Sequence, residues 1–517
     1  MHRRFAAAAF AALAFLASCA RGPSLVHVIH VNSLRGQVQP TLSGDVRSGG
    51  FSLLSGALAS VRAGLADGPV YTVAVYNAFH GTPEAHFTDG SAVIDLMKRV
   101  GFDALVVGPR EFYFGLPTLE RLAAEAGFPF LSANIVQEDG SRPAYLSPFF
   151  WDPEARVGLV GLSPRSVLSQ NLAQNVAGLR VVDEVEAAAA AVEELRRKGA
   201  RTIGLFAGGV FWGGKPEASD TAIAEGLLAL DGIDQYWFGG AADRADGIEL
   251  VERDGKIRVV VTQSGARFTN GRLLAVSTLA RSPEGAGFRT AAVDSTAVMP
   301  DRGLADALYA IETAVNDAMG KVIARSTADL SLDSEAECSM GNLVCDLFRA
   351  ESGSDVFLLN SGKLRAAFRT GDITQKDVYD TLPFGGNIVT ARMTGAQLLA
   401  VLERSCSFVG NPKAGRGFLQ VSGMSFEWDP SRPPGRLVVP GSVRVGSEPL
   451  DPDRSYLVGT EAYVFGGGDG YVEFKELGIA MESFDQDSIL AILQARLAAA
   501  GTVGASVEGR IVRLGAR

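Results

Sequence analysis

Strand-like apolar runs alternate with amphipathic helical segments from residue 24 to about residue 295. The runs "SLVHVIHV", "VYTVAVY" and "RVGLVGL" are each followed by a segment whose apolar residues recur at helical spacing. Such alternation is typical of a layered α/β domain, in which helices cover sheets with many parallel strands. The sequence therefore predicts an α/β fold for this part of the chain.

The 517 residues are long enough for at least two domains with separate cores. A stripe of apolar residues at helical spacing predicts a helix that links the two domains. The stripe consists of Leu304, Leu308, Ile311, Val315, Met319 and Val322. A second domain is expected from about residue 327 to the end. It opens with a helix capped near Ser334, and it continues through a β-rich stretch with turns at "DPSRPPGR" and "LDPDRSY".

The first 19 residues are interpreted as a targeting segment. A basic start, "MHRR", precedes an apolar run that is too short to span a bilayer. The order Leu16-Ala17-Ser18-Cys19 resembles the bacterial lipobox, which implies a lipid-modified Cys19 and a mature chain held on a membrane outside the cytoplasm, at the periplasmic face or the cell surface. An ordinary cleaved signal peptide is the alternative.

The charge balance and the cysteines exclude some classes of protein. A formal net charge of -10 and a pI near 5.2 argue against a nucleic-acid partner, which would require a basic surface. Cys338, Cys345 and Cys406 have neither disulfide nor zinc-site spacing, so they are interpreted as small core residues.

One loop raises a question about catalysis. The stretch "FDALVVGPREFYFG" follows a helix that ends at Gly101, and it predicts a buried strand followed by a loop from Gly108 to Phe112. Ligands and catalysts in open α/β sheets sit at such strand ends. Pro109 and Arg110, however, can neither hold a metal nor shuttle a proton near neutral pH.

Four motifs in the second domain carry a resemblance. In order and spacing, "NSGKLR", "TLPFGGNIV", "GRGFLQVSGM" and "FGGGDGY" resemble the C-terminal domain of the 5'-nucleotidase family. The resemblance implies an N-terminal calcineurin-like metallophosphoesterase domain, a layered α/β sandwich, over residues 20–300. It also implies a linker helix over 301–326 and an α+β C-terminal 5'-nucleotidase domain over 327–517, after the signal peptide at 1–19.

The first domain matches the family's five metal loops without their ligands. In the family these loops hold two divalent metals and a catalytic histidine-aspartate pair. The stretches that look like them are "IHVNSLRG", "YNAFHGTP", "GPREFYFG", "GLFAGG" and "FGGAADR". The expected positions carry Ser33, Arg35, Asn77, Pro109, Arg110, Tyr113, Ala207, Gly240 and Ala242. No histidine follows His86, so we expect no metal site, no catalytic residue and no cofactor.

The resemblance also implies a ligand site in the second domain. In the family two aromatic rings hold a base while polar side chains hold the sugar and phosphate. By motif these are Phe384, Tyr463, Asn360, Arg365 and Asp469. The alternative is that both rings are core residues and Asp469 caps a turn. Ser339 replaces a second phosphate-binding arginine and Lys363 replaces a loop glycine, so a nucleoside is favoured over a nucleotide.

Two other functions stay open at this point. An active hydrolase with an altered site would have to use Glu84, Asp89 or Glu111, with Asn77 as a weak neutral ligand, and none of the three carboxylates is at a ligand position. The second open function is that of a purely structural lipoprotein. The expected partners are a nucleoside or nucleotide ligand and a membrane, reached through the lipid anchor. The sequence gives no indication of which protein partners the chain has.

Overall fold

The computed structural model divides the chain into two compact units, Met1–Val315 and Asn316–Arg517. Each unit has its own sheets and its own hydrophobic core, and each is described by itself below. The structure describes residues 25–65, 67–171, 173–212, 218–240, 246–264, 268–280, 282–383, 385–411 and 417–515.

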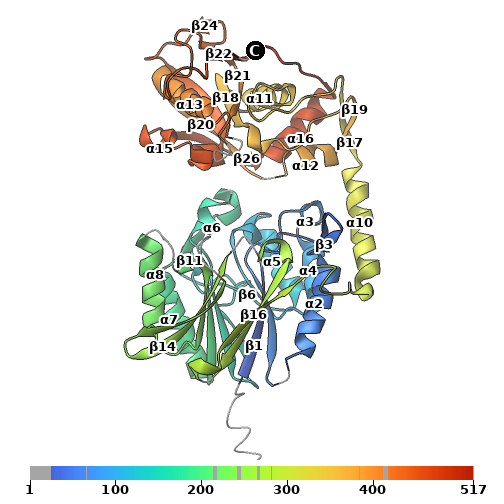
Figure 1. Cartoon of the computed structure of the whole chain (residues 1–517), viewed down its shortest axis with the longest axis vertical. Helices are drawn as coiled ribbons and strands as arrows, with labels where there is room; N and C mark the ends of the chain where they lie inside the picture. The colour runs from blue at the N-terminus through green and yellow to red at the C-terminus, as the bar shows by residue number, and fades with distance from the viewer. Residues whose placement is uncertain are drawn as a thin grey trace, which may run out of the picture. The chain divides into compact units, whose positions relative to one another are not determined.

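Two six-stranded sheets form the first unit (Figure 1). One has the order β16-β15-β1-β4-β5-β6, built from β1 (Leu25–Asn32), β4 (Val70–Val75), β5 (Ala104–Val106), β6 (Phe130–Leu131), β15 (Leu273–Ala280) and β16 (Gly287–Ala292). The other has the order β13-β14-β12-β11-β9-β8, built from β8 (Phe149–Asp152), β9 (Val157–Leu162), β11 (Thr202–Trp212), β12 (Gln235–Gly240), β13 (Gly247–Arg253) and β14 (Lys256–Ser264).

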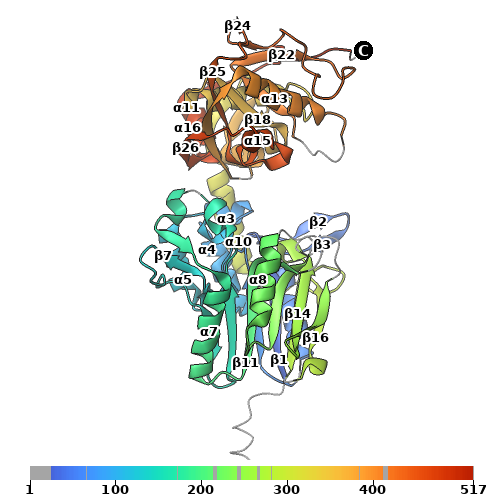
Figure 2. The same ribbon diagram turned by 90° about the vertical axis from the view of Figure 1, so that its left-hand side faces the viewer.

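Helices cover the outer face of each sheet, and the two inner faces pack against each other (Figures 1 and 2). The first sheet carries α2 (Phe51–Ala63), α4 (Ser91–Val100) and α5 (Leu116–Ala126), and the second carries α7 (Glu184–Lys198) and α8 (Ala218–Ala229). The layer between the sheets contains Val28, Val73, Val106, Leu159, Phe206 and Trp237. The predicted layered α/β sandwich is therefore confirmed.

Helix α4 shows why the sequence pattern was informative. Its buried residues lie three and four positions apart, and the helix stops at Gly101, which adopts φ 77°. A left-handed residue at the end of a helix is most easily supplied by glycine. The strand β5 follows at once and ends before Gly108, so the loop at residues 108–112 lies at the carboxyl end of a parallel strand, as predicted.

The second unit is built on a five-stranded sheet of order β21-β18-β25-β20-β26. Its strands are β18 (Val356–Asn360), β20 (Asn387–Thr394), β21 (Leu419–Ser422), β25 (Ser455–Glu461) and β26 (Met481–Ser488). The helices of this unit include α11 (Ser339–Ser352), α12 (Gln375–Thr381), α13 (Gly395–Ser407) and α16 (Ile489–Ala500). The mixture of largely antiparallel sheet and separate helices gives the predicted α+β fold.

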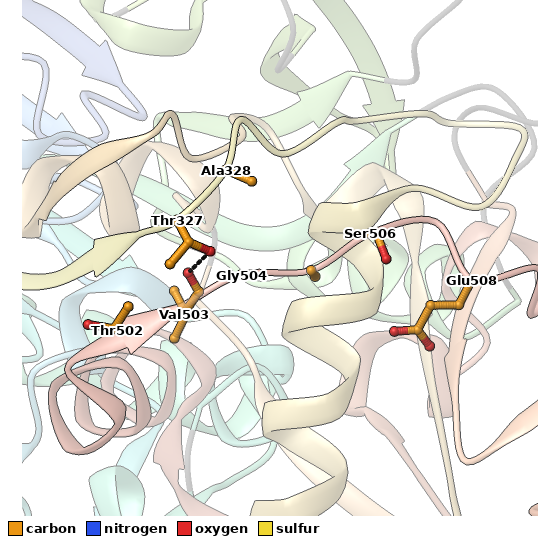
Figure 3. Close-up of a pocket in the computed structure, with 8 residues that line it drawn as sticks. Thr327, Ala328, Thr502, Val503, Gly504, Ser506 and Glu508 are labelled. Carbon is orange, nitrogen blue, oxygen red and sulfur yellow. Dashed lines mark hydrogen bonds between the residues drawn. The ribbon is translucent and has the colours of Figure 1, made fainter.

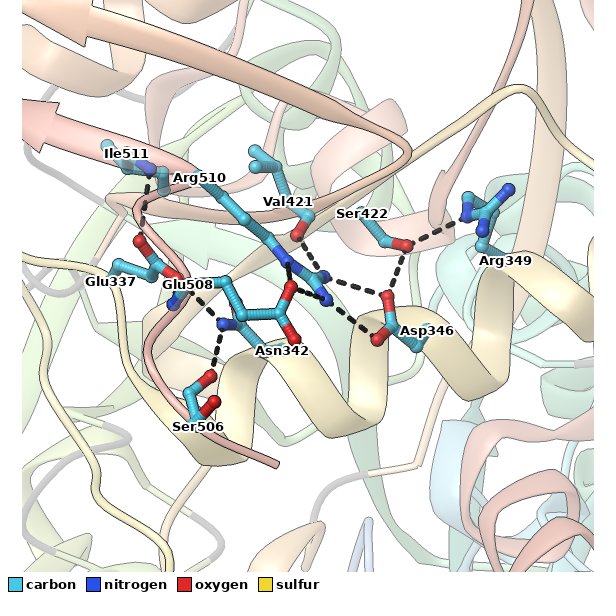
Figure 4. Close-up of polar contacts among 10 residues, drawn as sticks. All are labelled: Glu337, Asn342, Asp346, Arg349, Val421, Ser422, Ser506, Glu508, Arg510 and Ile511. Carbon is cyan, nitrogen blue, oxygen red and sulfur yellow. Dashed lines mark hydrogen bonds and ion pairs between the residues drawn. The ribbon is translucent and has the colours of Figure 1, made fainter. Parts of the chain in front are cut away.

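Two smaller sheets complete the second unit. One joins β17 (Val322–Ser326), β19 (Gly371–Thr374) and β27 (Thr502–Val503), and the other joins β22 (Met424–Trp428), β23 (Arg444–Val445), β24 (Glu448–Pro449) and β28 (Ile511–Arg513). Arg510, just before β28, donates to both carboxylate oxygens of Asp346 on α11, at 2.7 and 2.8 Å, and to the carbonyl of Val421 (Figure 4). This bidentate pair fastens the end of the chain to the α11 face.

The structure corrects two predicted helices. The linker helix expected over 301–326 is α10 (Ala305–Met319), and Val322 belongs to strand β17. Gly320 ends the helical run, and the β-branched Val322 pairs with Thr374 of β19, followed by Ala324 with Ile373. The helix expected to be capped near Ser334 begins instead at Ser339, where Cys338 is the N-cap and its sulfur accepts from the amide of Gly341.

Cys338, Cys345 and Cys406 are buried and unpaired, which confirms their interpretation as core residues. Burial raises the pKa of each of these thiols above its ordinary value. Separately, within the described part of the chain, no helix has both the length and the apolar character needed to cross a membrane.

Candidate functional site

The loops that follow β1 and β4 in the first unit are joined by backbone hydrogen bonds. The amide of Arg35 donates to the carbonyl of Asn77 at 2.7 Å, and the amide of Gly36 donates to the carbonyl of Ala78 at 2.7 Å. Ser33, Arg35 and Asn77 all have φ between 47° and 55°. Left-handed backbone is uncommon outside glycine and gathers at functional sites, so these loops keep the conformation of a site.

Arg110 brings the loop after β5 into the same cluster. Its amide donates to Asn77 Oδ1 at 3.2 Å, and its guanidinium donates to Nδ1 and the carbonyl of His80, at 3.2 and 3.3 Å. The ring of Tyr113 stacks on His80 with centroids 3.5 Å apart. Burial, helped by Arg110, holds the pKa of His80 well below its usual value. His80 is therefore neutral and accepts from Arg110, which leaves it no free role as a base.

Glu111 is a structural carboxylate. It is 1% exposed and accepts hydrogen bonds from the backbone amides of Asn77 (2.9 Å), Gly108 (2.7 Å) and Ala78. Burial raises its pKa to about 7, against the opposing effect of these amides. Because its oxygens are occupied by backbone donors, Glu111 fixes the loops after β4 and β5 rather than offering a ligand to a metal.

The remaining expected ligand positions lie on the second sheet or beyond it. Ala207 is a buried residue of β11, Gly240 ends β12, and Ala242 lies outside the described residues. Across the described ranges, no group of three or more histidine, cysteine, aspartate or glutamate side chains is placed to hold a metal ion. The side chains at the loop ends are hydroxyl, amide, guanidinium and ring groups, so they do not fit the dinuclear centre that the fold implies.

A buried polar network that the sequence analysis did not anticipate lies between the two sheets. Gln263 accepts from Asn32 and donates to His30 Nδ1 at 3.0 Å. His30 Nε2 donates to Ser277 Oγ at 2.8 Å, and Trp237 Nε1 donates to the same oxygen at 2.9 Å. His30 is 0% exposed, and burial lowers its pKa to about 3. The neutral imidazole thus joins the two sheets beneath the β1 loop.

In the second unit, the sheet topology gathers the candidate residues at one edge. Strands β18 and β25 are parallel, so their last residues, Asn360 and Glu461, lie at the same end of neighbouring strands. Strand β20 is antiparallel to β25 and pairs Ile388 with Glu461, so the segment just before β20 enters at the same edge. The glycine-rich turn η7 (Gly468–Gly470) follows β25 by a few residues.

Three of the predicted ligand-binding residues are in contact there. Asn360 Nδ2 donates to Asp469 Oδ2 at 2.6 Å, and the hydroxyl of Tyr463 donates to Asp469 Oδ1 at 3.0 Å. Tyr463 is 52% exposed, so its ring is not a core ring. Asp469 has φ 53°, and Asn360 keeps a buried Oδ1 that finds no hydrogen-bond partner in the part of the chain that the structure describes. The three therefore form one polar cluster with an accessible aromatic face, the Asn360–Asp469 cluster.

Of the other two predicted residues, the structure describes Arg365. Arg365 has an exposed side chain, and its amide donates to the carbonyl of Thr381. Phe384 lies outside the described residues. Ser339, at the position of the second expected arginine, is buried and accepts from the amide of Ser331 at 2.7 Å, so it contributes no charge to a ligand.

A separate hollow lies where β27 passes the end of β17. Thr327, Thr502, Gly504, Ser506 and Glu508 line an open pocket of about 470 Å³ (Figure 3). Thr327 donates to the carbonyl of Val503 at 3.2 Å. Small hydroxyls and backbone dominate the lining, and no catalytic group converges there.

The fold and the two groups of loop residues define a class: a metallophosphoesterase-like sandwich joined to a 5'-nucleotidase C-terminal domain. Residues 319–476 match the model of the 5'-nucleotidase C-terminal domain family. A snake venom 5'-nucleotidase from Gloydius brevicauda is 24% identical, over 96% of this chain and 90% of its own length. These likenesses support membership of the 5'-nucleotidase family, whose members hydrolyse nucleotides.

Solved structures agree with this fold along the chain. A 5'-nucleotidase precursor from Thermus thermophilus matches with a TM-score of 0.60 and 25% identity, over 95% of this chain and 100% of its own. A putative 5'-nucleotidase from Staphylococcus aureus, solved with alpha-ketoglutarate, matches with a TM-score of 0.69 and 18% identity, over 95% of this chain and 100% of its own. The second likeness bears on the fold alone.

Proposed function

We propose that this chain is a catalytically degenerate member of its family that binds nucleosides outside the cytoplasm without hydrolysing nucleotides. The observation that carries the proposal is the contrast between the units. In the first, Arg35, Asn77 and Arg110 occupy loop positions that would need metal ligands. In the second, Asn360, Tyr463 and Asp469 make a cluster suited to a sugar and a base.

The chemistry of the second cluster suits a nucleoside. A carboxylate such as Asp469 accepts hydrogen bonds from ribose hydroxyls, and the free Oδ1 of Asn360 is a further acceptor. The exposed ring of Tyr463 can stack on a base, and Phe384 is proposed as the second ring. Arg365 is proposed as the remaining contact, on the family motif "NSGKLR".

An active hydrolase with an altered site is the second candidate. Glu111 was one of its three possible carboxylates, and its oxygens accept from backbone amides instead. Glu84 and Asp89 lie on or next to the short helix α3 (Pro83–Phe87) rather than at a strand end. We therefore favour binding without turnover.

The test is to measure binding and hydrolysis on the same purified protein. Adenosine should bind in a calorimeter. AMP, UDP-glucose and a bis-phosphate ester, with manganese, cobalt or zinc added, should not be turned over at about 1 per second, an ordinary enzymatic rate. Tyr463→Ala and Phe384→Ala should each weaken adenosine about tenfold to a hundredfold, because one stacked ring contributes roughly 1 to 3 kcal/mol.

Tyr463→Phe is the matched control. It keeps the stacking face and removes only the hydroxyl that donates to Asp469. We expect adenosine binding within a few-fold of the wild-type value. Equal loss in Tyr463→Phe and Tyr463→Ala would mean that the ring does not stack on a base, and ordinary turnover with any metal would overturn the proposed degeneracy.

We further propose that the chain is a lipoprotein anchored through Cys19, at the periplasmic face or the cell surface. Cys19 lies outside the described residues, and the proposal is supported by the order "LASC" after a short apolar run. Labelled fatty acid should enter the wild-type protein in bacterial cells and should not enter Cys19→Ala. Equal labelling of the two proteins would rule out the anchor.

A further inference from the structure

A buried ion pair adjoins the Asn360–Asp469 cluster. Lys363 Nζ lies 2.9 Å from Glu461 Oε1, and the two side chains are 8% and 2% exposed. The ammonium also donates to the carbonyl of Gly385 at 2.7 Å. Lys363 replaces a loop glycine of the family motif, and the structure shows that its ammonium is paired with Glu461 and with a backbone carbonyl.

The sheet places this pair beside the proposed ligand residues. Glu461 ends β25 next to the end of β18, where Asn360 donates to Asp469. Asp469 is close enough that its charge, after the dominant effect of burial, also raises the pKa of Glu461, while Lys363 lowers it. The pair and the cluster therefore share one electrostatic environment.

Gly386, just before β20, packs closely against the ion pair. A Cβ on Gly386 would lie 2.2 Å from Glu461 Oε1 and 3.1 Å from Lys363 Nζ, so only glycine fits against the pair. The amide of Ile489 donates to the carbonyl of Gly386 at 2.9 Å, which holds that glycine in place. Buried and packed in this way, the charges are poorly screened by water.

Apart from Arg365, whose side chain is exposed to solvent, the charges of the ion pair and the Asn360–Asp469 cluster do not balance. Glu461 and Asp469 contribute two negative charges, and Lys363 contributes one positive charge. In addition, Asn360 Oδ1 is a buried acceptor that has no hydrogen-bond partner among the described residues. Such a site suits a neutral molecule that carries hydroxyl or amino donors, and it repels a phosphate.

We propose that Glu461 determines the selectivity of this site: by neutralising Lys363 it makes the site take an uncharged nucleoside in preference to the 5'-phosphate. The inference rests on the proposed nucleoside binding and names the residue that excludes the phosphate. Glu461 acts here as a specificity-determining residue through the charge of Lys363, rather than as a catalytic residue.

The test compares adenosine and AMP by calorimetry on the full purified chain. In the wild-type protein the ratio of the AMP Kd to the adenosine Kd should be at least one. Glu461→Gln leaves the Lys363 ammonium without its carboxylate partner, so that it can attract the phosphate of AMP. The ratio should therefore fall by about tenfold or more. Lys363→Met leaves both carboxylates unopposed, so the ratio should rise.

The double variant Lys363→Met with Glu461→Gln is the matched control. It removes one charge of each sign, so its net charge equals that of the wild-type site, and its ratio should stay within about threefold of the wild-type value. It also avoids a lone buried charge, which is the change most apt to prevent folding. If the ratio of the AMP Kd to the adenosine Kd fell as far in the double variant as in Glu461→Gln, the proposal would be overturned.

A measurement on the unmutated protein provides an independent check. Salt screens the repulsion between the phosphate and the carboxylates of the site. Raising the salt concentration from about 0.05 to 0.5 M should therefore strengthen the binding of AMP relative to that of adenosine. Weaker AMP binding at high salt would reveal an attractive phosphate site and overturn the inference. Absence of binding by both ligands would instead overturn the proposed nucleoside binding, so the two failures are distinguishable.

Discussion

Replacing Glu111 with alanine is expected to lower the free energy of unfolding of the first unit by about 3 to 5 kcal/mol. Its carboxylate accepts from the backbone amides of Asn77, Ala78 and Gly108. Without it, at least three amides in a buried loop lose their acceptor, and each unpaired donor costs about 1 to 3 kcal/mol, less whatever entering water restores. Few single substitutions are expected to cost as much.

Urea unfolding followed by tryptophan fluorescence measures this effect. Trp151, Trp212 and Trp237 lie in the first unit and only Trp428 in the second, so the signal reports mainly on the first. Glu120, exposed on α5, supplies the control, since Glu120→Ala should change the free energy by no more than about 0.5 kcal/mol. If Glu111→Ala changed the free energy of unfolding by no more than Glu120→Ala does, Glu111 would not be the residue that holds these loops.

Acid is expected to destabilise the first unit through His30. The pKa of His30 is about 3 in the folded protein, below its ordinary value of 6.5, because the imidazole is fully buried. The unfolded chain therefore takes up the proton first as the pH falls. The stability contributed by His30 is complete above pH 6.5, and it is lost at about 1.4 kcal/mol per pH unit between 6.5 and 3, roughly 5 kcal/mol altogether.

His30→Gln separates this contribution from the other acid-sensitive groups. Glutamine keeps a hydrogen-bonding side chain between Gln263 and Ser277 and does not titrate. The free energy of unfolding, measured by urea at several pH values from 7 to 4, should decline less steeply in His30→Gln than in the wild type, by up to about 1.4 kcal/mol per pH unit. Parallel profiles would show that folding does not lower the pKa of His30.

Local signals in the sequence explain what could be predicted. Helix α4 has periodic apolar residues and a terminal glycine, so both its face and its end at Gly101 were predictable. Helix α10 has the same periodicity and is followed by Gly320, but the prediction continued the apolar stripe past this glycine to Val322 in strand β17. There, pairing with β19, a segment about fifty residues later, outweighed the helical pattern.

Some contacts could not be predicted from the sequence because they join residues that are far apart along the chain. Lys363 and Glu461 are 98 residues apart, and nothing near Lys363 indicates that its charge is paired. His30 and Ser277 are 247 residues apart, and a single histidine in an apolar strand predicts only burial. The motifs did place Asn360 and Asp469 together, although their role in binding stays a prediction.

The three buried cysteines make the chain convenient for measurements of motion. Thiol reagents attack exposed thiolates, and burial suppresses the thiolate form of Cys338, Cys345 and Cys406. The chain has four cysteines, so Cys19→Ala would remove the fourth. A cysteine introduced at one exposed position in each unit could then be labelled selectively, and the distance between two dyes would report whether the separation of the units changes when a nucleoside is added.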